Sequence, residues 1–327
     1  MARYLPGSWI VTLIVATVLR SLMPAASSTV YAAPTAPLSE LWAAPTDLAE
    51  RDLFLGPWGA AKAPDPNAVY KFIRAKSHGA NPGVVVRDAN GREWHVKQEG
   101  RTLGFEGPAE VTLSRILSAV GYHQPPIYFL PSFTMTTATG TAVEPGGRFR
   151  LVDPVLHDRG EWSWQANPFV DRQQYAGLLV ILVMFNSSDL KNSNNTLYEV
   201  ARGNGLERWY VVRDLGSSLG ETSRYRPRRN DVHRFERSGF IRGVTADGFV
   251  EFEYRGKSTE LLRRITPADV GWASELLDRL SAKQWNDAFR AGGYPPETAA
   301  RYIAVLRNRI VQGRELADGE WARKERR

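Results

Sequence analysis

The sequence predicts an α+β fold arranged in two lobes, a small β-rich first part and a mainly helical second part. Three observations point to it. Short segments rich in β-branched and aromatic residues cluster between residues 69 and 133. The run at 173–185 is apolar on every side, as in a helix buried inside a large domain. From residue 266 onward, apolar residues recur at helical spacing behind helix-start signals.

The first part begins with three predicted strands at residues 69–75, 83–88 and 92–98. The last two are joined by the turn DANG, in which Asn-Gly can adopt the positive φ values that a tight hairpin needs. The loop KSHGANPG joins the first two strands and contains Gly79 and Gly83. These elements predict a small antiparallel sheet.

A helix and a further strand follow. PAEVTLSRILSAVG, residues 108–121, has apolar residues at helical spacing, with Pro108 suited to the first turn and Gly121 to the C-terminal exit. IYFLPSF, residues 127–133, is a predicted strand. Residues 140–168 are rich in Pro, Gly and Trp, and we expect them to be irregular.

After the buried helix, the segments 196–200 and 208–215 are predicted to form a hairpin around RGNG. A basic segment then carries six arginines between Arg224 and Arg237, and a second hairpin is expected within 239–256. The chain ends in three predicted helices, at residues 266–280, 281–293 and 295–310. The first of them opens with Thr-Pro, a good N-cap and first helical residue.

The N-terminus has the three parts of a secretory signal peptide. Arg3 precedes the apolar stretch 9–19, and small residues lead to VYA, so that cleavage is expected after Ala32. The apolar stretch is too short to span a bilayer and Arg20 closes it, so we expect no membrane span in the mature chain. An uncleaved anchor is the alternative. We therefore expect export to the periplasm or the medium.

The pattern divides the chain into a signal peptide (1–32), a lead-in segment (33–66), a β-rich lobe (67–168), a helical lobe (169–318) and a basic tail (319–327). The sequence has no cysteine, which excludes disulfides, lipid attachment at a lipobox-type cysteine, and thiolate chemistry. The formal net charge of +7 favours an anionic ligand or surface. No nucleic-acid-binding motif is visible, so a nucleic-acid partner is not expected.

Four charged features occur in a fixed order: Lys97 on a strand, Glu110 in the next helix, Asp189 and Asn194 after the buried helix, and Asp214 in a DLG strand end. Each alone has an ordinary structural explanation, such as a solvated edge lysine, a helix-dipole glutamate or a turn aspartate. Together they match the needs of phosphoryl transfer. That reaction needs a cation for the phosphates, a carboxylate to hold the cation, oxygen ligands for a metal, and an Asp for the attacking hydroxyl.

The same segments resemble the protein-kinase-like superfamily in its atypical branches, the HipA-like, phosphatidylinositol-kinase-like and secreted spore-coat or Golgi-type kinases. WHVKQ resembles the strand with the kinase lysine, and AEVTLSRILSAVGYHQPP the helix with its paired glutamate. SSDLKNSNNTLY resembles the catalytic loop H-R-D-L-K-x-x-N, and VVRDLGSSLG the strand ending in D-F-G. DLG and QWNDAFRAGGY also resemble an uncharacterised family of exported bacterial proteins. The resemblance covers about residues 69–220 and implies a two-lobed kinase-like fold.

The resemblance implies a phosphotransferase that uses ATP, or another nucleoside triphosphate, with Mg²⁺ or Mn²⁺. Lys97 would contact the phosphates and Glu110 would pair with Lys97. Gly79 and Gly83 would let backbone N–H groups approach a phosphate, although their loop is not G-x-G-x-x-G. The γ-phosphate would move to a hydroxyl of an acceptor that the sequence does not identify.

In the catalytic loop, the resemblance makes Asp189 the base or hydroxyl orienter and lets Lys191 neutralise charge on the γ-phosphate. Asn194 and Asp214 would hold the metal, with Asn195 as the alternative to Asn194. Ser187 stands where the family has His, and no segment from D-F-G to A-P-E is visible, so activation-loop control is not expected. The arginines of 224–237 either form a solvated surface or favour an acidic or phosphorylated acceptor.

Other interpretations are open. A catalytically inactive kinase-fold module that binds a nucleotide, glycan or protein, or a nucleotidyl transferase, would use the same groups. GSSLG, with Ser218 and the later His233, suits a serine hydrolase, although that motif requires a helix directly after the serine. The tryptophans of WSW (162–164) would suit a sugar-binding surface. The five histidines lack metal-ligand spacing.

Overall fold

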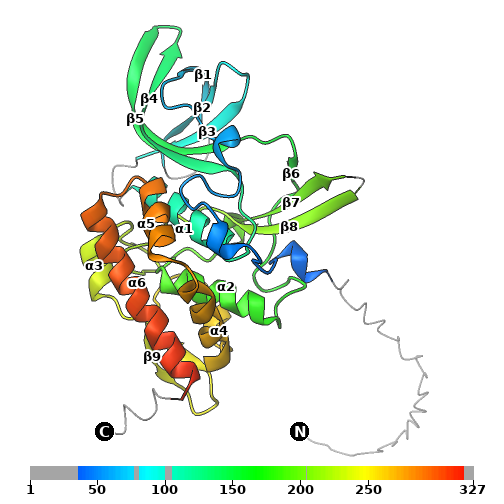
Figure 1. The fold of residues 1–327 in the computed structure, drawn as a ribbon, viewed down its shortest axis with the longest axis vertical. Helices are drawn as coiled ribbons and strands as arrows, with labels where there is room; N and C mark the ends of the chain where they lie inside the picture. Colours follow the sequence, from blue (N-terminus) through cyan, green and yellow to red (C-terminus); the bar gives the residue numbers. More distant parts are fainter. Residues whose placement is uncertain (1–35, 77–80, 100–104, 204, 320–327) are drawn as a thin grey trace, which may run out of the picture. The chain divides into compact units, whose positions relative to one another are not determined.

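The computed structural model describes residues 36–76, 81–99, 105–203 and 205–319. It confirms the predicted mixed α+β class: strands dominate up to residue 158 and helices dominate after residue 266 (Figure 1). The predicted signal peptide, the predicted basic tail beyond residue 319, and Gly79 lie outside the described residues. Within the described part of the chain, no helix is long and apolar enough to cross a membrane.

Five strands form a closed barrel in the order β1-β2-β3-β5-β4. They are β1 (Val69–Ala75), β2 (Gly83–Arg87), β3 (Glu93–Gln98), β4 (Ile127–Thr137) and β5 (Gly140–Leu151). The barrel has its own apolar core, in which Tyr70, Trp94, Phe133 and Phe149 are at most 2% exposed. Because side chains alternate along a strand, Trp94 and Val96 point into this core and Lys97 emerges on the outer face of β3.

β5 corrects the expectation that residues 140–168 are irregular, because it pairs with both β3 and β4. The Pro-Gly-Gly sequence at its centre is needed for close packing. A methyl group at Gly146 would lie 2.2 Å from the carbonyl oxygen of Leu130, and one at Gly147 would lie 2.7 Å from that of Lys97. The glycines therefore allow the strands of a small barrel to approach one another, which a sequence pattern of breakers does not reveal.

Helix α1 (Glu106–Ala119) follows the barrel's third strand and is buried along most of its length. It contacts β4 and β5 on one side and helix α5 on another. It begins two residues earlier than the predicted helix and ends close to Gly121, where a φ of 104° turns the chain away. α1 is therefore the element that lies between the barrel and the helical part of the molecule.

Helix α2 (Gln173–Met184) forms the centre of the largest apolar core, as its sequence predicts. α2 packs against α4 (Pro267–Asp278), α4 packs against α6 (Pro296–Ala317), and α6 contacts α5 (Ala282–Ala291). Capping boxes begin α4 and α5: Thr266 with Asp269, and Ser281 with Gln284. Helix α6 continues seven residues beyond the predicted end at 310.

A three-stranded sheet of order β6-β7-β8 holds the two loops of interest. Its strands are β6 (Leu156–Asp158), β7 (Asn195–Arg202) and β8 (Gly205–Val212). Asn195 pairs with Val212, so the loop that enters β7 and the loop that leaves β8 lie at the same end of the hairpin. The sequence in these two loops is SSDLKNSN and RDLGSS.

The remaining elements are short. They are α3 (Val232–Arg237), β9 (Ile241–Val244), β10 (Val250–Phe252) and the 3₁₀ helices η1 (Leu38–Glu40), η2 (Leu48–Glu50), η3 (Ala60–Lys62), η4 (Asn192–Asn194) and η5 (Thr259–Leu262). The described lead-in residues join the main core through Leu41, Leu48 and Leu53. Trp162 and Trp164 are 5% and 1% exposed, so WSW belongs to the core and offers no sugar-binding surface.

Candidate active site

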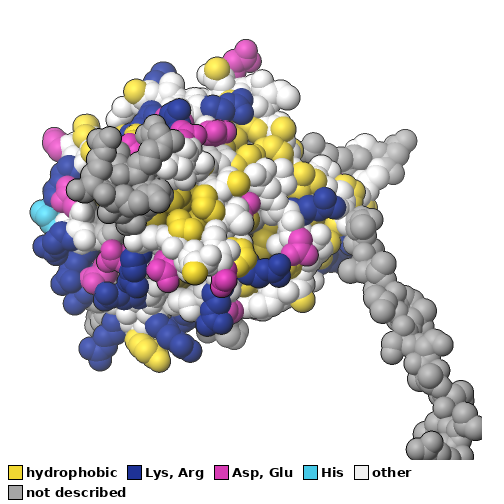
Figure 2. Space-filling model, turned by 90° about the horizontal axis from the view of Figure 1, so that it is seen from below, with side chains coloured by type: hydrophobic (Ala, Val, Ile, Leu, Met, Phe, Trp, Pro, Cys, Tyr) yellow, Lys and Arg dark blue, Asp and Glu magenta, His cyan; other side chains and the backbone are white. Residues whose placement is uncertain are grey.

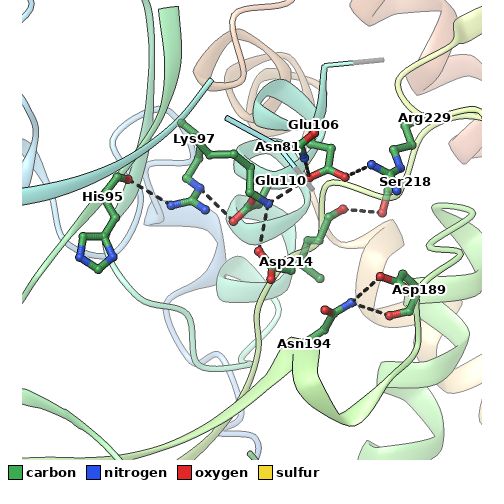
Figure 3. A network of polar contacts seen from close by, with 12 residues as sticks. Asn81, His95, Lys97, Glu106, Glu110, Asp189, Asn194, Asp214, Ser218 and Arg229 are labelled. Carbon is green, nitrogen blue, oxygen red and sulfur yellow. Dashed lines mark hydrogen bonds and ion pairs between the residues drawn. The ribbon is translucent and has the colours of Figure 1, made fainter. Parts of the chain in front are cut away.

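Lys97 is the centre of a buried ionic cluster. Its side chain is 7% exposed, and its Nζ lies 3.0 Å from Glu106, 2.9 Å from Glu110 and 3.0 Å from Asp214 (Figure 3). Lys97 and Asp214 are 117 residues apart in the chain, so no local turn explains their contact. The structure thus brings together three of the groups that the sequence singled out, Lys97, Glu110 and Asp214, and adds Glu106.

Glu106 and Glu110 reach the same ammonium group because residues four apart share one face of a helix. Glu110 also forms an ion pair with Arg148 of β5, with 3.0 Å between Arg148 Nε and Glu110 Oε1. Glu106 also contacts Arg229 and accepts a hydrogen bond from Asn81, 2.6 Å away. The spacing of Glu106 from Glu110 was visible in the sequence, but the contact with Arg229 depends on the tertiary fold.

The charges in this cluster hold one another in their ionised forms. Burial alone would lower the pKa of Lys97, but the carboxylates of Glu110 and Asp214 outweigh it and raise that pKa above its usual value. Burial would likewise raise the pKa of Glu110, yet Arg148 and Lys97 keep it below its usual range. The same two cations, Lys97 first, hold the pKa of Asp214 well below its ordinary value against the effect of burial. The site is ionic at neutral pH.

Asp214 owes its position to a sharp turn at the end of β8. Its φ is 51°, in the left-handed region that Asp tolerates better than most residues. Two residues later, a methyl group on Gly216 would lie 2.4 Å from Cβ of Glu106. The glycine of DLG therefore allows the first turn of α1 to approach, and this approach brings the glutamates to Lys97.

The loop that carries Asp189 is joined to the segment around Asp214 by backbone hydrogen bonds. Arg213 N donates to Asn194 O at 2.7 Å, and Ser188 N donates to Ser217 O at 2.8 Å. Asn194 Nδ2 donates to the backbone oxygen of Asp189 at 2.7 Å and to its carboxylate at 3.1 Å (Figure 3). The two loops therefore form one structural unit.

The two asparagines have different surroundings. The amide nitrogen of Asn194 is turned to Asp189, and in Figure 3 its amide oxygen points to the other side, toward Asp214. Asn195 is 0% exposed and donates to the backbone oxygen of Trp162 at 3.1 Å. Asn194 is the one of the two whose oxygen could reach a ligand beside Asp214.

Two lysines flank Asp189. Lys191 Nζ lies 2.9 Å from Asp189 Oδ2, and Lys257 Nζ lies 2.8 Å from Asp189 Oδ1. Burial would raise the pKa of Asp189, but Lys257, Lys191 and Asn194 lower it below its usual value. Lys257 is a site residue that the sequence did not reveal, because nothing in its local sequence distinguishes it from a surface lysine.

Gly83, which is predicted to let a phosphate approach, also has a packing role. It begins β2 opposite Lys97, and a methyl group there would lie 2.4 Å from Val96 O. Its carbonyl accepts a hydrogen bond from Lys76 N at 2.9 Å. The close approach of β2 and β3 thus explains this glycine.

The serine hydrolase interpretation is wrong. Ser218 is 1% exposed and donates to Leu215 O at 2.6 Å. The next helix, α3, begins only at Val232 and is too far along the chain to form a nucleophile elbow. His233 is exposed and contacts Arg301.

The residues present suit a divalent metal that is completed by a ligand. Asp214 has a 44% exposed side chain, and the Asn194 amide nitrogen is bound to Asp189, which leaves its amide oxygen without a hydrogen-bond donor among the described residues. Hard oxygens of this kind are what Mg²⁺ and Mn²⁺ prefer. Among the residues that the structure describes, no group of three or more His, Cys, Asp and Glu side chains could hold a metal by itself. A metal here would need oxygens from a bound phosphate.

The chain was compared with protein-family models, curated proteins and solved structures. No protein-family model matches the chain, and no curated protein matches it. Among solved structures, the chain is similar to the Helicobacter pylori proinflammatory kinase CtkA, at 10% sequence identity and a TM-score of 0.43. The match covers 78% of this chain and 99% of CtkA. At this TM-score the similarity supports no conclusion about function, which depends on the geometry described above.

Proposed function

We propose that the protein is a metal-dependent phosphotransferase with a two-lobed, protein-kinase-like arrangement. It would move the γ-phosphate of ATP, or of another nucleoside triphosphate, to a hydroxyl group. The proposal depends on one observation: Lys97 forms ion pairs with Glu110 and Asp214, and the segment of Asp214 is hydrogen-bonded to the loop of Asp189 and Asn194. Phosphoryl transfer requires groups of these kinds, and it requires them close together.

Further cations around the cluster support a polyanionic ligand. Burial, Arg148 and Arg213 lower the pKa of Arg150 to about 10. Partial desolvation and the charge of Lys97 lower the pKa of Lys76, although the residue as a whole is exposed. Cations that depress one another's pKa are stabilised by a bound anion, and a triphosphate supplies one.

Lys97 would contact the nucleotide phosphates, and Glu110 would hold its ammonium group in place. Asp214 and Asn194 would hold Mg²⁺ or Mn²⁺, which when bound would neutralise phosphate charge. Contacts within the protein hold these side chains: Lys97 and Arg148 hold Glu110, and Asp189 holds Asn194. Such preorganisation is the main contribution that a protein makes to this reaction.

Asp189 would orient the attacking hydroxyl. Its low pKa makes it a weak base, so its role is to accept a hydrogen bond from the hydroxyl and aim the oxygen. Lys191, 43% exposed and next to Asp189, would face the transferred phosphoryl group.

The acceptor is proposed to be acidic or phosphorylated. Figure 2 shows the molecule from below, relative to the view of Figure 1. Lys and Arg side chains gather along one edge of this face. Arg224, Arg226 and Arg228 are exposed in the segment that follows DLG. Arg229 is partly buried against Glu106, so it belongs to the site and is unsuitable for testing this surface. Charge reversal at Arg226 and Arg228 should weaken acceptor binding and leave nucleotide binding unchanged, and unaltered acceptor affinity would rule out this role.

The first test is metal-dependent nucleotide binding. Calorimetry with ATP and GTP, with and without Mg²⁺ or Mn²⁺, should show binding that depends on the metal. Label from γ-labelled nucleotide should then appear on an acceptor in a screen of proteins, sugars and small molecules.

Variants separate an enzyme from a binding module. Asp189→Ala should lower transfer by about 10²-fold or more while the fold and nucleotide binding remain. Asp214→Ala should remove mainly the metal dependence. Asp278→Ala, at an exposed ion pair on α4, is the matched control and should change neither phosphate transfer nor the metal dependence of nucleotide binding. Metal-independent binding that all three variants retain would favour a non-catalytic module.

Export remains part of the proposal and can be checked directly. N-terminal mass analysis of protein recovered from the periplasm or medium should find a chain that begins at Ala33. A chain that retains residues 1–32 in the cytoplasm would contradict export.

A further inference from the structure

The segment from Tyr254 to Lys257 lies against the loop that carries Asp189. Tyr254 Oη donates to Ser187 O at 2.9 Å, and Lys257 N donates to Ser188 O at 2.8 Å. Both hydrogen bonds join residues about seventy positions apart, so the contact is a tertiary one and no local turn produces it.

The local sequence is suited to this contact. Gly256 lies so close to the loop that a methyl group on it would be 2.7 Å from Ser188 O and 2.2 Å from Tyr254 Oη. Tyr254 is 8% exposed. Ser258 follows with a φ of 53°, a conformation that non-glycine residues adopt rarely, and turns the chain into η5. Together these residues fix where the Lys257 side chain begins.

Lys257 differs from Lys191 in what it can do for Asp189. Lys191 is two residues away in the same loop, so it moves with Asp189 and cannot fix that loop relative to the rest of the molecule. Lys257 belongs to a segment that is anchored separately, including by Arg255 N, which donates to Thr222 Oγ1 at 3.0 Å. The Nζ of Lys257 forms an ion pair with Asp189 Oδ1 at 2.8 Å. Asn194 donates a hydrogen bond to Oδ2, and Lys191 forms an ion pair with Oδ2.

We propose that Lys257 is a positioning residue that fixes the carboxylate of Asp189 for the acceptor hydroxyl. Because Lys257 contacts one carboxylate oxygen of Asp189 and Asn194 and Lys191 contact the other, the carboxylate cannot rotate freely about its χ2 bond. Such preorganisation lowers the barrier of a reaction more in a protein site than in water. The proposal rests on the proposed function of Asp189. It concerns the acceptor side of the site, so it predicts no role in nucleotide or metal binding.

The kinetic test uses Lys257→Met, Lys257→Arg and Lys283→Met in the full chain, with ATP and Mn²⁺ and the best acceptor from the screen. Lys257→Met should lower kcat by about tenfold or more and leave the KM for ATP within twofold, because only the aim of the hydroxyl is lost. Lys257→Arg keeps a cation next to Asp189 and should recover most of kcat. Lys283→Met, at an exposed lysine that also pairs with one Asp, is the control and should behave as the wild type.

Hydrogen exchange of the peptide over residues 186–195 gives a readout that does not need activity. Lys257→Met should speed exchange there, and Lys283→Met should not. If the wild type transfers no phosphate, the proposed function fails, and faster exchange in Lys257→Met still supports the positioning contact. Unchanged exchange, unchanged kcat, or a loss of ATP binding equal to the loss of kcat would each overturn the role of Lys257.

Discussion

At Lys97 a single ammonium group, 7% exposed, contacts three carboxylates from two different segments. A buried charge is tolerated only where partners replace its lost hydration, so the lysine and its carboxylates depend on one another. The function of each residue in the site therefore depends on its contacts as well as on its type. Substitutions of single side chains with different neighbours test this dependence.

Asn194 and Asn195 are adjacent residues with different expected roles. Asn194→Ala should weaken Mn²⁺-dependent nucleotide binding, because the Asn194 amide oxygen is turned toward Asp214; it also removes two hydrogen bonds to Asp189, so Tm should fall as well. For Asn195→Ala we expect no change in nucleotide binding. Asn195→Ala should lower Tm by several degrees, because it leaves Trp162 O without its buried donor. Calorimetric titration and thermal unfolding of the two variants would check this. The reverse pattern would make Asn195 the metal ligand.

His95 should make stability depend on pH. Burial, with Arg150, Arg74 and Arg148, lowers the pKa of His95 to about 4, against 6.5 in the unfolded chain. Between these values the unfolded state binds more protons, so stability falls as the pH drops from 6.5 to 4. His95→Gln should remove this part of the acid sensitivity, on the order of 1–2 kcal/mol after allowing for partial exposure. Denaturant unfolding at pH 7 and pH 4.5 tests it, and equal acid losses in both proteins would contradict it.

At the scale of elements, the predicted helices were found almost where the sequence placed them, because apolar spacing and capping residues are local signals. The strands β1, β2 and β3 were also found within one residue at each end. β5 was missed because its pattern is interrupted by Pro-Gly-Gly, whose reason lies in β3 and β4. A barrel strand that depends on close approach to its neighbours leaves little periodic signal in its own sequence.

Gly146→Ala should therefore damage the barrel. The added methyl group would lie 2.2 Å from Leu130 O, in the backbone of the neighbouring strand, so β4 or β5 must shift. We expect a loss of about 2–4 kcal/mol in the free energy of unfolding. Gly243→Ala in β9 is the control, since a methyl group there meets nothing within 4 Å. Urea unfolding of both variants measures the difference, and a neutral Gly146→Ala would show that the strands are not so close.

At the scale of the whole molecule, sequence order indicated which charged groups belong together, but not what holds them. The order of four groups along the chain, and the resemblance of their segments to kinase motifs, allowed the prediction of Lys97, Glu110, Asp189 and Asp214. Four further site residues could not be predicted, because their importance lies in contacts with distant residues. They are Glu106, Arg148, Arg229 and Lys257. Their sequence neighbourhoods are those of ordinary surface or strand residues.

Arg309 is another long-range link of this kind. From α6 it donates to Met184 O at 2.6 Å, Asn186 Oδ1 at 2.9 Å and Ser238 O at 2.9 Å, and so connects three segments. Burial lowers the pKa of Arg309 to about 9, which shows that the charge is costly to keep there. Arg309→Met relieves that cost but removes the donor from two buried acceptors and one partly buried acceptor, so a net loss of about 2 kcal/mol is expected. Arg314→Met, at an exposed ion pair on the same helix, should cost less than about 1 kcal/mol.

The contact between Lys97 and Asp214 has a thermodynamic consequence for the proposed reaction. One Asp214 oxygen contacts the Lys97 ammonium group at 3.0 Å, so Lys97 competes with a cation for that oxygen. In the proposed reaction, a triphosphate would give Lys97 another anionic neighbour and would release the oxygen to the metal. Metal and nucleotide should then bind with positive linkage, each raising the affinity for the other by the same factor.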